Sequence, residues 1–292
     1  MPSSSRPRVS GPAESDSSDS RKAPAVALPR PRRRQRVLAR RSPRSKRLLL
    51  WLPAVGVLLA LGVWQVLWLR QVFPSYMLPS PASVADKWWL LYRNGTLLHH
   101  AGVTLREALL GFAVAFVVGV GLGYPLARFH TFDVIFGPYV AVSQAMPVIA
   151  FAPLLVVWFG LGLLPKVIIC ALIVFFPILV NTVVGLRSID PSLIEASWSM
   201  GASDWQTLRY VEVPLMLRPL LGGIKMGLTL SMTGAVVGEF VSSSAGLGYL
   251  MMLGRTAYDI PMVYVAALTM ATIATIGYVV ISLLERLVDA LV

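Results

Sequence analysis

Charged side chains are scarce in this sequence: Asp, Glu, Lys and Arg make up 14% of its 292 residues, whereas soluble domains carry about 25%. Hydrophobic residues account for 56%, and the mean hydropathy is +0.69. Long apolar runs recur along most of the chain. This pattern excludes an ordinary water-soluble domain and predicts an all-α protein that spans a lipid bilayer several times.

Cysteine and histidine are also rare. The single cysteine, Cys170, excludes an internal disulfide and any cysteine-based zinc site. Its position inside an apolar run predicts an inert, packed thiol. His99 and His100 are adjacent, so on a helix they point in different directions, and no acidic cluster accompanies them. We therefore expect no metal site.

The chain also has no G-x-x-x-x-G-K-[ST] motif. In nucleotide-binding proteins that motif cradles the phosphates with backbone N–H groups and a lysine. We therefore expect this chain to bind no ATP by such a loop and to carry no cofactor of its own.

The positive charge that is present lies almost entirely in residues 1–47. This segment holds 14 Lys and Arg against 3 acidic residues, and the remaining 12 basic and 11 acidic residues nearly cancel. It is rich in Ser, Pro and Arg, and it cannot bury enough apolar surface to fold, so we predict a disordered tail. We interpret the tail as a cytoplasmic anchor under the positive-inside rule. Its run RPRRRQR (30–36) would also suit RNA or anionic lipid.

We expect residues 48–292 to form one multi-pass domain in the cell membrane. Apolar segments that can cross a hydrocarbon core of about 30 Å predict about six transmembrane helices, at 48–69, 104–127, 134–159, 164–186, 220–241 and 262–284. With the basic tail inside, both termini are cytoplasmic. The segment 71–100 is too polar to span, and Trp88, Trp89 and Tyr92 suit a helix in the outer interface.

Small residues recur in the second expected span, at Gly111, Gly119, Gly121 and Gly123. In membranes, small residues let helix backbones approach closely, so these four glycines predict close packing.

Prolines interrupt the third expected span at Pro147 and Pro153. They free backbone carbonyls, which a bilayer tolerates only beside protein or a water-filled path. Ser143, Gln144 and Pro147 are therefore candidates for lining a translocation path. The alternative is that the two polar side chains make interhelical hydrogen bonds.

Glu239 is the one carboxylate in an apolar-to-small stretch near the outer end of the fifth expected span. It is a further candidate for the path, and it could instead pair with Arg255 or make a structural hydrogen bond. One carboxylate cannot supply the paired roles of acid–base catalysis, and the sequence has no H-E-x-x-H motif. An intramembrane enzyme is therefore the least favoured class.

A polar loop at about 190–214 interrupts the apolar pattern. Asp190 and Pro191 suit the start of a helix, and Gly201 suits the left-handed conformation that ends one. Ser203 and Gln206 form a capping box for a second helix, which Pro214 ends or bends into the next span. Its apolar ridge, at Trp205, Leu208 and Val211, would either meet a partner protein or pack on the chain's own helices.

The loop resembles the cytoplasmic signature of inner-membrane permeases of ATP-binding-cassette importers. That signature is Glu-Ala-Ala, three residues, Gly, nine residues, Ile, one residue and Leu-Pro. The sequence matches its spacing with Glu195-Ala196-Ser197, Gly201, Val211 and Val213-Pro214. It departs from the signature at Ser197, Val211 and Val213. Residues 146–162 and 238–251 are similar to the branch that serves nitrate, sulfonates, taurine and thiamine-pyrimidine precursors.

The resemblance implies a homodimeric permease of the type I importer fold, in which two copies of the permease work with two ATPase subunits that bind ATP and Mg²⁺. An external solute-binding protein would deliver a small solute. The residues expected to couple the permease to the ATPase are Glu195, Ala196, Ser197, Gly201, Val211 and Pro214. The chain itself would then be a transport subunit and not an enzyme.

The remaining alternative is an ion-coupled secondary carrier or a channel. Such proteins usually keep functional charges at mid-membrane, and we find no charge near the centre of an expected span. No Arg or Lys lies clearly inside a span either.

The predicted topology can be tested with fused reporters that are active only in the cytoplasm. Because the basic tail orients the first span, fusions after residues 47, 130, 200 and 290 should be active. Fusions after residues 95, 162 and 252 should be silent. Activity at 95 together with silence at 200 would reverse the topology and remove the loop from the cytoplasm.

Overall fold

The computed structural model describes residues 43–144 and 146–291. The chain divides into two units, one up to Pro53 and one from Ala54 onward. The predicted tail lies outside the described residues except for the start of α1 (Pro43–Leu69). All regular elements of the described residues are helical, which agrees with the predicted all-α class.

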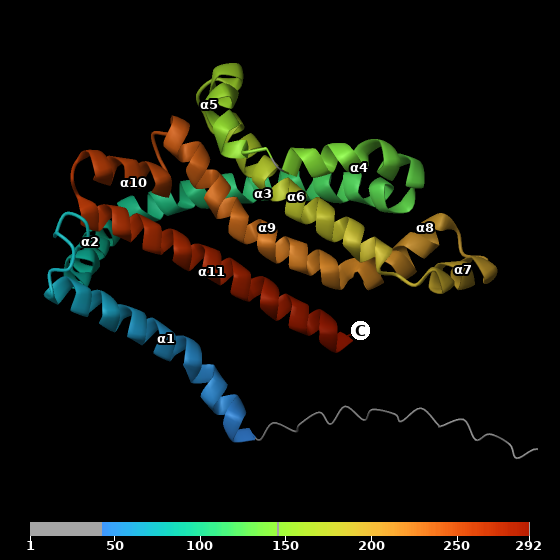
Figure 1. Ribbon diagram of the computed structural model, residues 1–292, viewed down its shortest axis with the longest axis horizontal. Helices are drawn as coiled ribbons and strands as arrows, with labels where there is room; N and C mark the ends of the chain where they lie inside the picture. The colour runs from blue at the N-terminus through green and yellow to red at the C-terminus, as the bar shows by residue number, and fades with distance from the viewer. Residues whose placement is uncertain (1–42, 145, 292) are drawn as a thin grey trace, which may run out of the picture. The chain divides into compact units, whose positions relative to one another are not determined.

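Helices follow one another along the second unit with short connections (Figure 1). After α1 come α2 (Pro81–Arg93), α3 (Thr96–Arg128), α4 (His130–Gln144), α5 (Val148–Phe159), α6 (Leu163–Arg187), α7 (Pro191–Ser199), α8 (Asp204–Thr207), the π-helix η1 (Leu208–Glu212), α9 (Val213–Ser242), α10 (Leu247–Thr256) and α11 (Ile260–Leu291).

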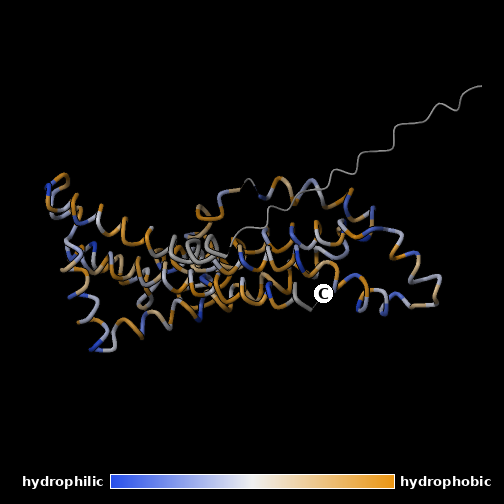
Figure 2. Tube along the Cα trace, turned by 90° about the horizontal axis from the view of Figure 1, so that it is seen from below, coloured by the Kyte–Doolittle hydropathy of each residue, from blue (hydrophilic) through white to orange (hydrophobic). Residues whose placement is uncertain are grey.

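Four helical stretches of the described chain are long and apolar enough to cross a membrane: Thr96–Arg128, Leu163–Arg187, Asp204–Ser242 and Ile260–Leu287. Apolar residues dominate the long helices (Figure 2). These stretches contain the second, fourth, fifth and sixth expected spans. The first expected span lies within α1, whose apolar part with described side chains, Val55–Leu69, is shorter than a full span.

The third expected span is a bent pair of helices. α4 and α5 are inclined at 96° to each other and together have the length and composition of a fifth span. Pro147 occupies the N-cap position of α5, so the predicted proline break lies there, whereas Pro153 lies inside α5.

The polar segment between the first two long helices contains the predicted helix, α2. The rings of Trp88 and Tyr92 stack with centroids 5.3 Å apart, and both side chains are exposed. The indole N–H of Trp64 in α1 donates to the Pro79 carbonyl, 3.0 Å away, just before α2. α3 then begins at Thr96, earlier than the expected position 104. His99 and His100 therefore lie in its first turns.

α6 is the central helix of the second unit, and α3 packs along one side of it. Three glycines of α3 face α6 so closely that an added Cβ would clash. Their contacts are Gly111 on Cys170, Gly119 on Ile178 and Gly123 on Thr182. The constant offset shows that the two helices run parallel and in register. Gly121 has open space around it, so the prediction of close packing is wrong at that one position.

α9 packs along the other side of α6 and runs antiparallel to it. A Cβ at Gly234 would lie 2.7 Å from the Cα of Cys170, and one at Gly238 would lie 3.0 Å from that of Lys166. Towards the other end of the pair, Gly223 meets Asn181. α11 in turn packs against α9, α10 and α2. Buried Leu247, Leu250, Val265 and Ala266 form the core between α10 and α11.

The parallel run of α3 and α6 requires the chain to return from the end of α3 to the start of α6. α4 and α5 make that return. The bent pair therefore leads the chain from the end of the bundle near Arg128 to the opposite end near Leu163.

Candidate functional site

The polar loop forms a well-capped short helix, α7. The Asp190 carboxylate accepts a hydrogen bond from the backbone N–H of Ser192, 3.0 Å away, and Pro191 occupies the first turn. Hydrogen bonds from the Ser192 backbone and side chain lower the pKa of the Asp190 carboxyl. The predicted helix start is confirmed, because the exposed N–H groups of the first turn have the expected acceptor.

Gly201 ends α7 as predicted. Its φ is +82°, in the left-handed region that residues with a Cβ avoid. Its N–H donates to the Trp198 carbonyl at 2.9 Å, and the next N–H, of Ala202, donates to the Ser197 carbonyl at 3.1 Å. This pair of bonds is the Schellman arrangement that satisfies the last carbonyls of a helix.

The second helix of the loop is continuous with the following membrane helix. Ser203 and Gln206 form the predicted capping box at the start of α8. After Thr207 the chain widens into η1 and passes directly into α9, with Pro214 in the first turn of α9. Pro214 thus does not end the second helix. The wider π-turn before it accommodates a residue that lacks an N–H.

A hydroxyl pair joins the two halves of the loop. Ser197 is buried, and its Oγ lies 2.9 Å from the Thr207 Oγ1 and 2.7 Å from the Ile194 carbonyl oxygen. Ser197 is one of the departures from the resembled signature. The pairing of two small hydroxyl residues across the Gly201 turn could have suggested this contact from the sequence.

Several large apolar side chains are exposed on the outer surface of the loop, beside polar ones. Glu195 and Ala196 are exposed, and so are Met200 at 84%, Trp205 at 66% and Tyr210 at 71%. The predicted ridge is only partly free, because Leu208 and Val211 are half-buried. Large exposed apolar side chains on a capped, polar loop are typical of a surface that meets another protein.

The same end of the bundle carries a small charged cluster beneath α7. Arg128, the last residue of α3, lies with its guanidinium carbon 5.1 Å from the centroid of the Trp198 ring. Its Nη1 is 3.8 Å from an oxygen of Glu212, which is only 3% exposed. Arg187, at the end of α6, binds Asp133 of α4 at 2.8 Å and the Leu126 carbonyl at 3.1 Å.

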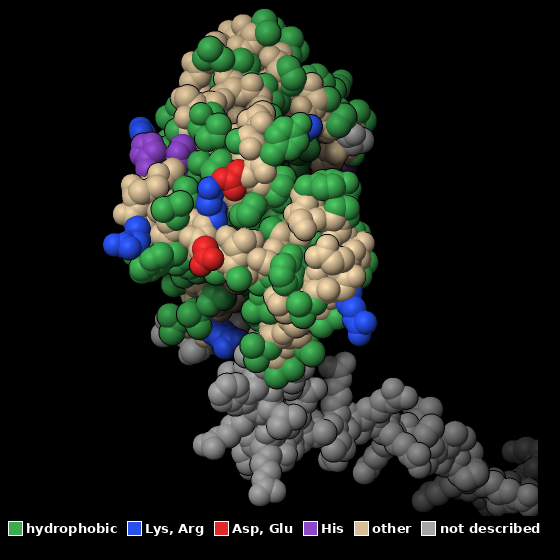
Figure 3. Space-filling model, turned by 90° about the vertical axis from the view of Figure 1, so that its left-hand side faces the viewer, with side chains coloured by type: hydrophobic (Ala, Val, Ile, Leu, Met, Phe, Trp, Pro, Cys, Tyr) green, Lys and Arg blue, Asp and Glu red, His purple; other side chains and the backbone are tan. Residues whose placement is uncertain are grey.

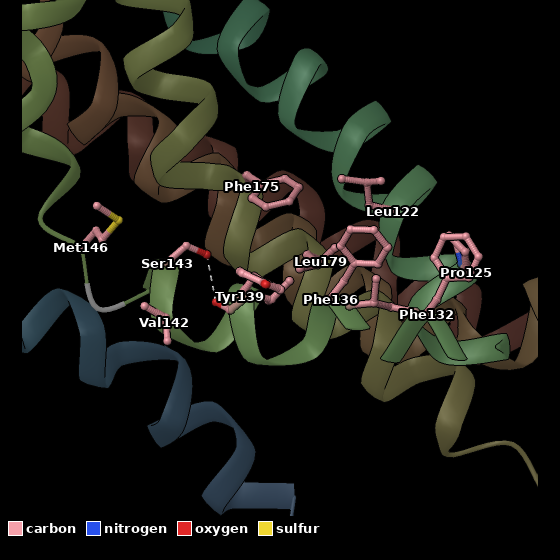
Figure 4. Close-up of a pocket in the computed structure, with 12 residues that line it drawn as sticks. Leu122, Pro125, Phe132, Phe136, Tyr139, Val142, Ser143, Met146, Phe175 and Leu179 are labelled. Carbon is pink, nitrogen blue, oxygen red and sulfur yellow. Dashed lines mark hydrogen bonds between the residues drawn. The ribbon is translucent and has the colours of Figure 1, made fainter. Parts of the chain in front are cut away.

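An apolar cavity of about 470 Å³ opens between α3, α4 and α6 (Figure 4). Phe136 and Leu179 reach into it from α4 and α6, and Leu122 and Pro125 approach from α3. Among the described residues, none that lines this cavity carries a charge. Its full lining is Leu122, Pro125, Leu126, Phe132, Phe136, Tyr139, Val140, Val142, Ser143, Met146, Phe175 and Leu179.

The four residues predicted for the translocation path do not gather at one place. Ser143 lines the apolar cavity, where its hydroxyl donates to the Val140 carbonyl at 3.1 Å. Gln144 and Pro147 line a neighbouring cavity of about 350 Å³ that reaches Thr233 of α9. Glu239 lines none of these cavities.

Glu239 instead caps α10. Its carboxylate accepts hydrogen bonds from the Thr104 hydroxyl at 2.6 Å and from the Gly248 N–H at 2.5 Å. The Leu247 N–H donates to Thr104 at 2.7 Å. Of the three readings considered for Glu239, the structure confirms the structural hydrogen bond. The distant Arg255 is exposed and is not among the partners that the structure records for Glu239.

A buried ion pair stands beside this cap. Lys166 donates to Glu107 at 2.7 Å and to the Ser243 hydroxyl at 2.8 Å, and both charged residues are buried. On the end of the unit that carries α2 and α10, hydrophobic side chains alternate with backbone and uncharged polar groups, and charged side chains are few (Figure 3). Lys166 lies in the first turn of α6, and its ammonium turns inward to meet Glu107 of α3.

A second lysine also lies inside a span. Lys225 of α9 pairs with Glu285 of α11 and lies 5.5 Å from the centroid of the Tyr278 ring. Lys225 lies within the spanning stretch Asp204–Ser242, so the expectation that no Arg or Lys lies clearly inside a span is wrong at this position. Its partner Glu285 is 60 positions away in the chain.

No group of three or more His, Cys, Asp or Glu within residues 43–144 and 146–291 could hold a metal ion. The Nδ1 of His100 accepts a hydrogen bond from the Gly246 N–H at 2.8 Å, so this histidine serves the α10 turn.

Comparison with known families decides the class of the protein. Residues 115–291, which hold both the loop and the apolar cavity, match the family described as binding-protein-dependent transport system inner membrane component. The chain belongs to this family. It is a permease, a transport component of the membrane and not an enzyme, and the alternative of an ion-coupled carrier is set aside.

Relatives of the permease carry out transport of several small solutes. The riboflavin transport system permease protein RibX of Chloroflexus aurantiacus is 46% identical over 80% of this chain and 89% of its own length. The formylaminopyrimidine transport permease protein ThiX of Halalkalibacterium halodurans is 30% identical over 80% of this chain and 93% of its own. A taurine transport system permease protein, TauC of Escherichia coli, is 29% identical over 72% and 78%.

The fold of the permease agrees with this family. A chain of the MetNI methionine ABC transporter in an inward-facing conformation aligns with a TM-score of 0.58 at 20% identity. The alignment covers 70% of this chain and 98% of that one. The predicted type I importer architecture is therefore confirmed.

The buried Lys166 pair provides a stability test of the permease. Lys166→Met leaves Glu107 without its cation, and breaking a buried pair by removing one partner costs about 3–5 kcal/mol. We expect a clear fall in the thermal unfolding midpoint in detergent. The matched control is Lys87→Met, because the Lys87–Asp259 pair is partly exposed and such pairs contribute about 1 kcal/mol or less. Equal shifts for the two variants would contradict the buried pairing.

Proposed function

We propose that this permease is driven by a separate ATPase subunit that docks on the loop 190–214. The observation that carries the proposal is the arrangement of the loop. Two short helices meet at Gly201 and expose Trp205 and Tyr210 to solvent, 66% and 71% accessible. An ATPase cleft would receive this surface, and Glu195, Ala196, Ser197, Gly201, Val211 and Pro214 would shape it.

The charges of the chain support one orientation. Residues 1–47 hold most of the excess positive charge, and such segments stay in the cytoplasm. We infer that both termini and the loop are cytoplasmic and that α2 and α10 lie on the outer side. A solute-binding protein would then deliver its cargo to the outer end.

The working unit would be a pair of permeases with two ATPases. ATP and Mg²⁺ would bind to the ATPase subunits, because this chain lacks the phosphate-cradling motif. Exposed apolar side chains of α4 that do not line the cavity, among them Val134 and Ile135, would face the second permease or lipid. No cofactor is proposed for the permease itself.

A planar, uncharged aromatic ring is the solute type that the apolar cavity suits best. Phe132, Phe136, Tyr139 and Phe175 line it, and aromatic rings stack favourably on one another. A sulfonate or nitrate would require a cationic or strongly polar lining. The 46% identical relative is a riboflavin transport permease, so we propose a flavin-like solute for this permease.

The docking proposal predicts that Gly201→Val uncouples transport from ATP hydrolysis. No atom lies within 4 Å of an added Cβ, so the change strains only the φ of +82°, by about 1–2 kcal/mol. That cost would tilt α7 without unfolding the bundle. In proteoliposomes, stimulation of ATP hydrolysis by loaded binding protein should be lost. Gly121→Val is the control, because it also has open space and has an ordinary helical backbone.

The solute proposal predicts that riboflavin, and not taurine or an alkyl sulfonate, is taken up by the reconstituted transporter. Phe136→Ala removes one stacking face worth about 1 kcal/mol, so KM should rise about fivefold. Phe129→Ala is the matched control. Its ring continues the same aromatic row, 6.0 Å from Phe132, but does not line the cavity. Uptake of taurine alone would overturn the flavin proposal and leave the family assignment intact.

A further inference from the structure

A cavity lies between α7 and the end of the helix bundle. A cavity of about 250 Å³ separates Pro191 and Ile194 of α7 from the ends of α3 and α6. The regular elements with which α7 mainly packs are α8 and η1, its own neighbours in the loop. The inner face of α7 therefore has room to move relative to the membrane helices.

Arg128 lines this cavity and reaches across it to α7. It is the last residue of α3, and its guanidinium lies over the Trp198 ring of α7 at 5.1 Å. A guanidinium on an aromatic face is attracted by the ring and covers it with a flat surface. This contact joins α7 to α3, whereas the Ser197–Thr207 hydroxyl pair joins α7 to α8 and so to the start of α9.

The second contact of Arg128 is incomplete. Its Nη1 lies 3.8 Å from Glu212 Oε1, beyond a good hydrogen bond. Glu212 is only 3% exposed, and within the described part of the chain its Oε2 has no hydrogen-bond partner, although Tyr124 of α3 lies close to this carboxylate. A buried carboxylate oxygen without a partner is costly, and a guanidinium can satisfy both oxygens at once. A small shift of Arg128 towards Glu212 would make that pairing.

The same turn of α3 forms a wall of the apolar cavity. Leu122, Pro125 and Leu126 line the cavity, and Arg128 follows directly. A solute that displaces this end of α3 would therefore move Arg128 with it.

We propose that Arg128 is the positioning residue that links the apolar cavity to α7. In one arrangement the guanidinium stacks on Trp198, as in this structure. In the other it closes on both oxygens of Glu212 and releases the ring, so that α7 loses its contact with α3 and keeps only those with α8 and η1. The inference rests on the proposed docking of an ATPase on the loop and on the proposed binding of the solute in the apolar cavity.

The test uses the full transporter in proteoliposomes and measures solute transported per ATP hydrolysed. Arg128→Gln removes both contacts, and the ratio should fall about fivefold or more, the usual lower range of coupling between sites. Arg128→Lys keeps the charge but loses the planar stack and the bidentate pairing, so it should restore the ratio only in part. Trp198→Leu, on a side chain that is 43% exposed, should lower the ratio even if Arg128→Gln fails to insert.

Arg187→Gln is the matched control. Arg187 lines the same cavity from α6, but its recorded partners are Asp133 and Leu126. It should reduce thermal stability and leave the ratio unchanged. An equal effect of Arg187→Gln, or no effect of Arg128→Gln and Trp198→Leu, would overturn the inference. If Gly201→Val also kept full stimulation, the docking proposal itself would fail. A defect in Gly201→Val without one in Arg128→Gln would remove this inference alone.

Discussion

Close contact between helix backbones is the constraint on which the rest of this fold depends. A bilayer offers no water to drive helices together, so association comes from packing and from polar contacts between helices. Here Cys170 of α6 lies against Gly111 of α3 on one side and Gly234 of α9 on the other. The three helices share this central contact, and α11 adds to it through α9.

Ionic contacts stand at both ends of that packed centre and hold the helices in one register. Lys166 binds Glu107 near the start of α6, and Arg187 binds Asp133 near its end. Glycine rows alone would allow one helix to slide along another by a turn. The Lys166 pair opposes such a slip, because it would leave the buried Glu107 unpaired. At the other end the Arg187 guanidinium also donates to the Leu126 carbonyl of α3.

Local features were predictable from the sequence, and distant partnerships were not. The caps of α7 and α8 and the turn at Gly201 follow from residues within a few positions of one another. The role of Glu239 could not be predicted, because its partner Thr104 is 135 positions away. The buried pair of Lys166 and Glu107 could not be predicted for the same reason, because the two residues are 59 positions apart. Gly121 could have been excluded, since two positions along a helix point to nearly opposite sides. The π-turn before Pro214 has no simple sequence signal, and the incomplete contact between Arg128 and Glu212 depends on how three separate elements meet.

The burial of Cys170 has a practical consequence. It is the one thiol of the chain, and its side chain is fully buried. Because α3 and α9 cover it, these helices must separate from α6 before a reagent can reach the sulfur. The rate at which a membrane-permeant maleimide modifies the protein therefore measures how often α3, α6 and α9 part. The native Cys170 thus reports how often the central contact opens, without an introduced label.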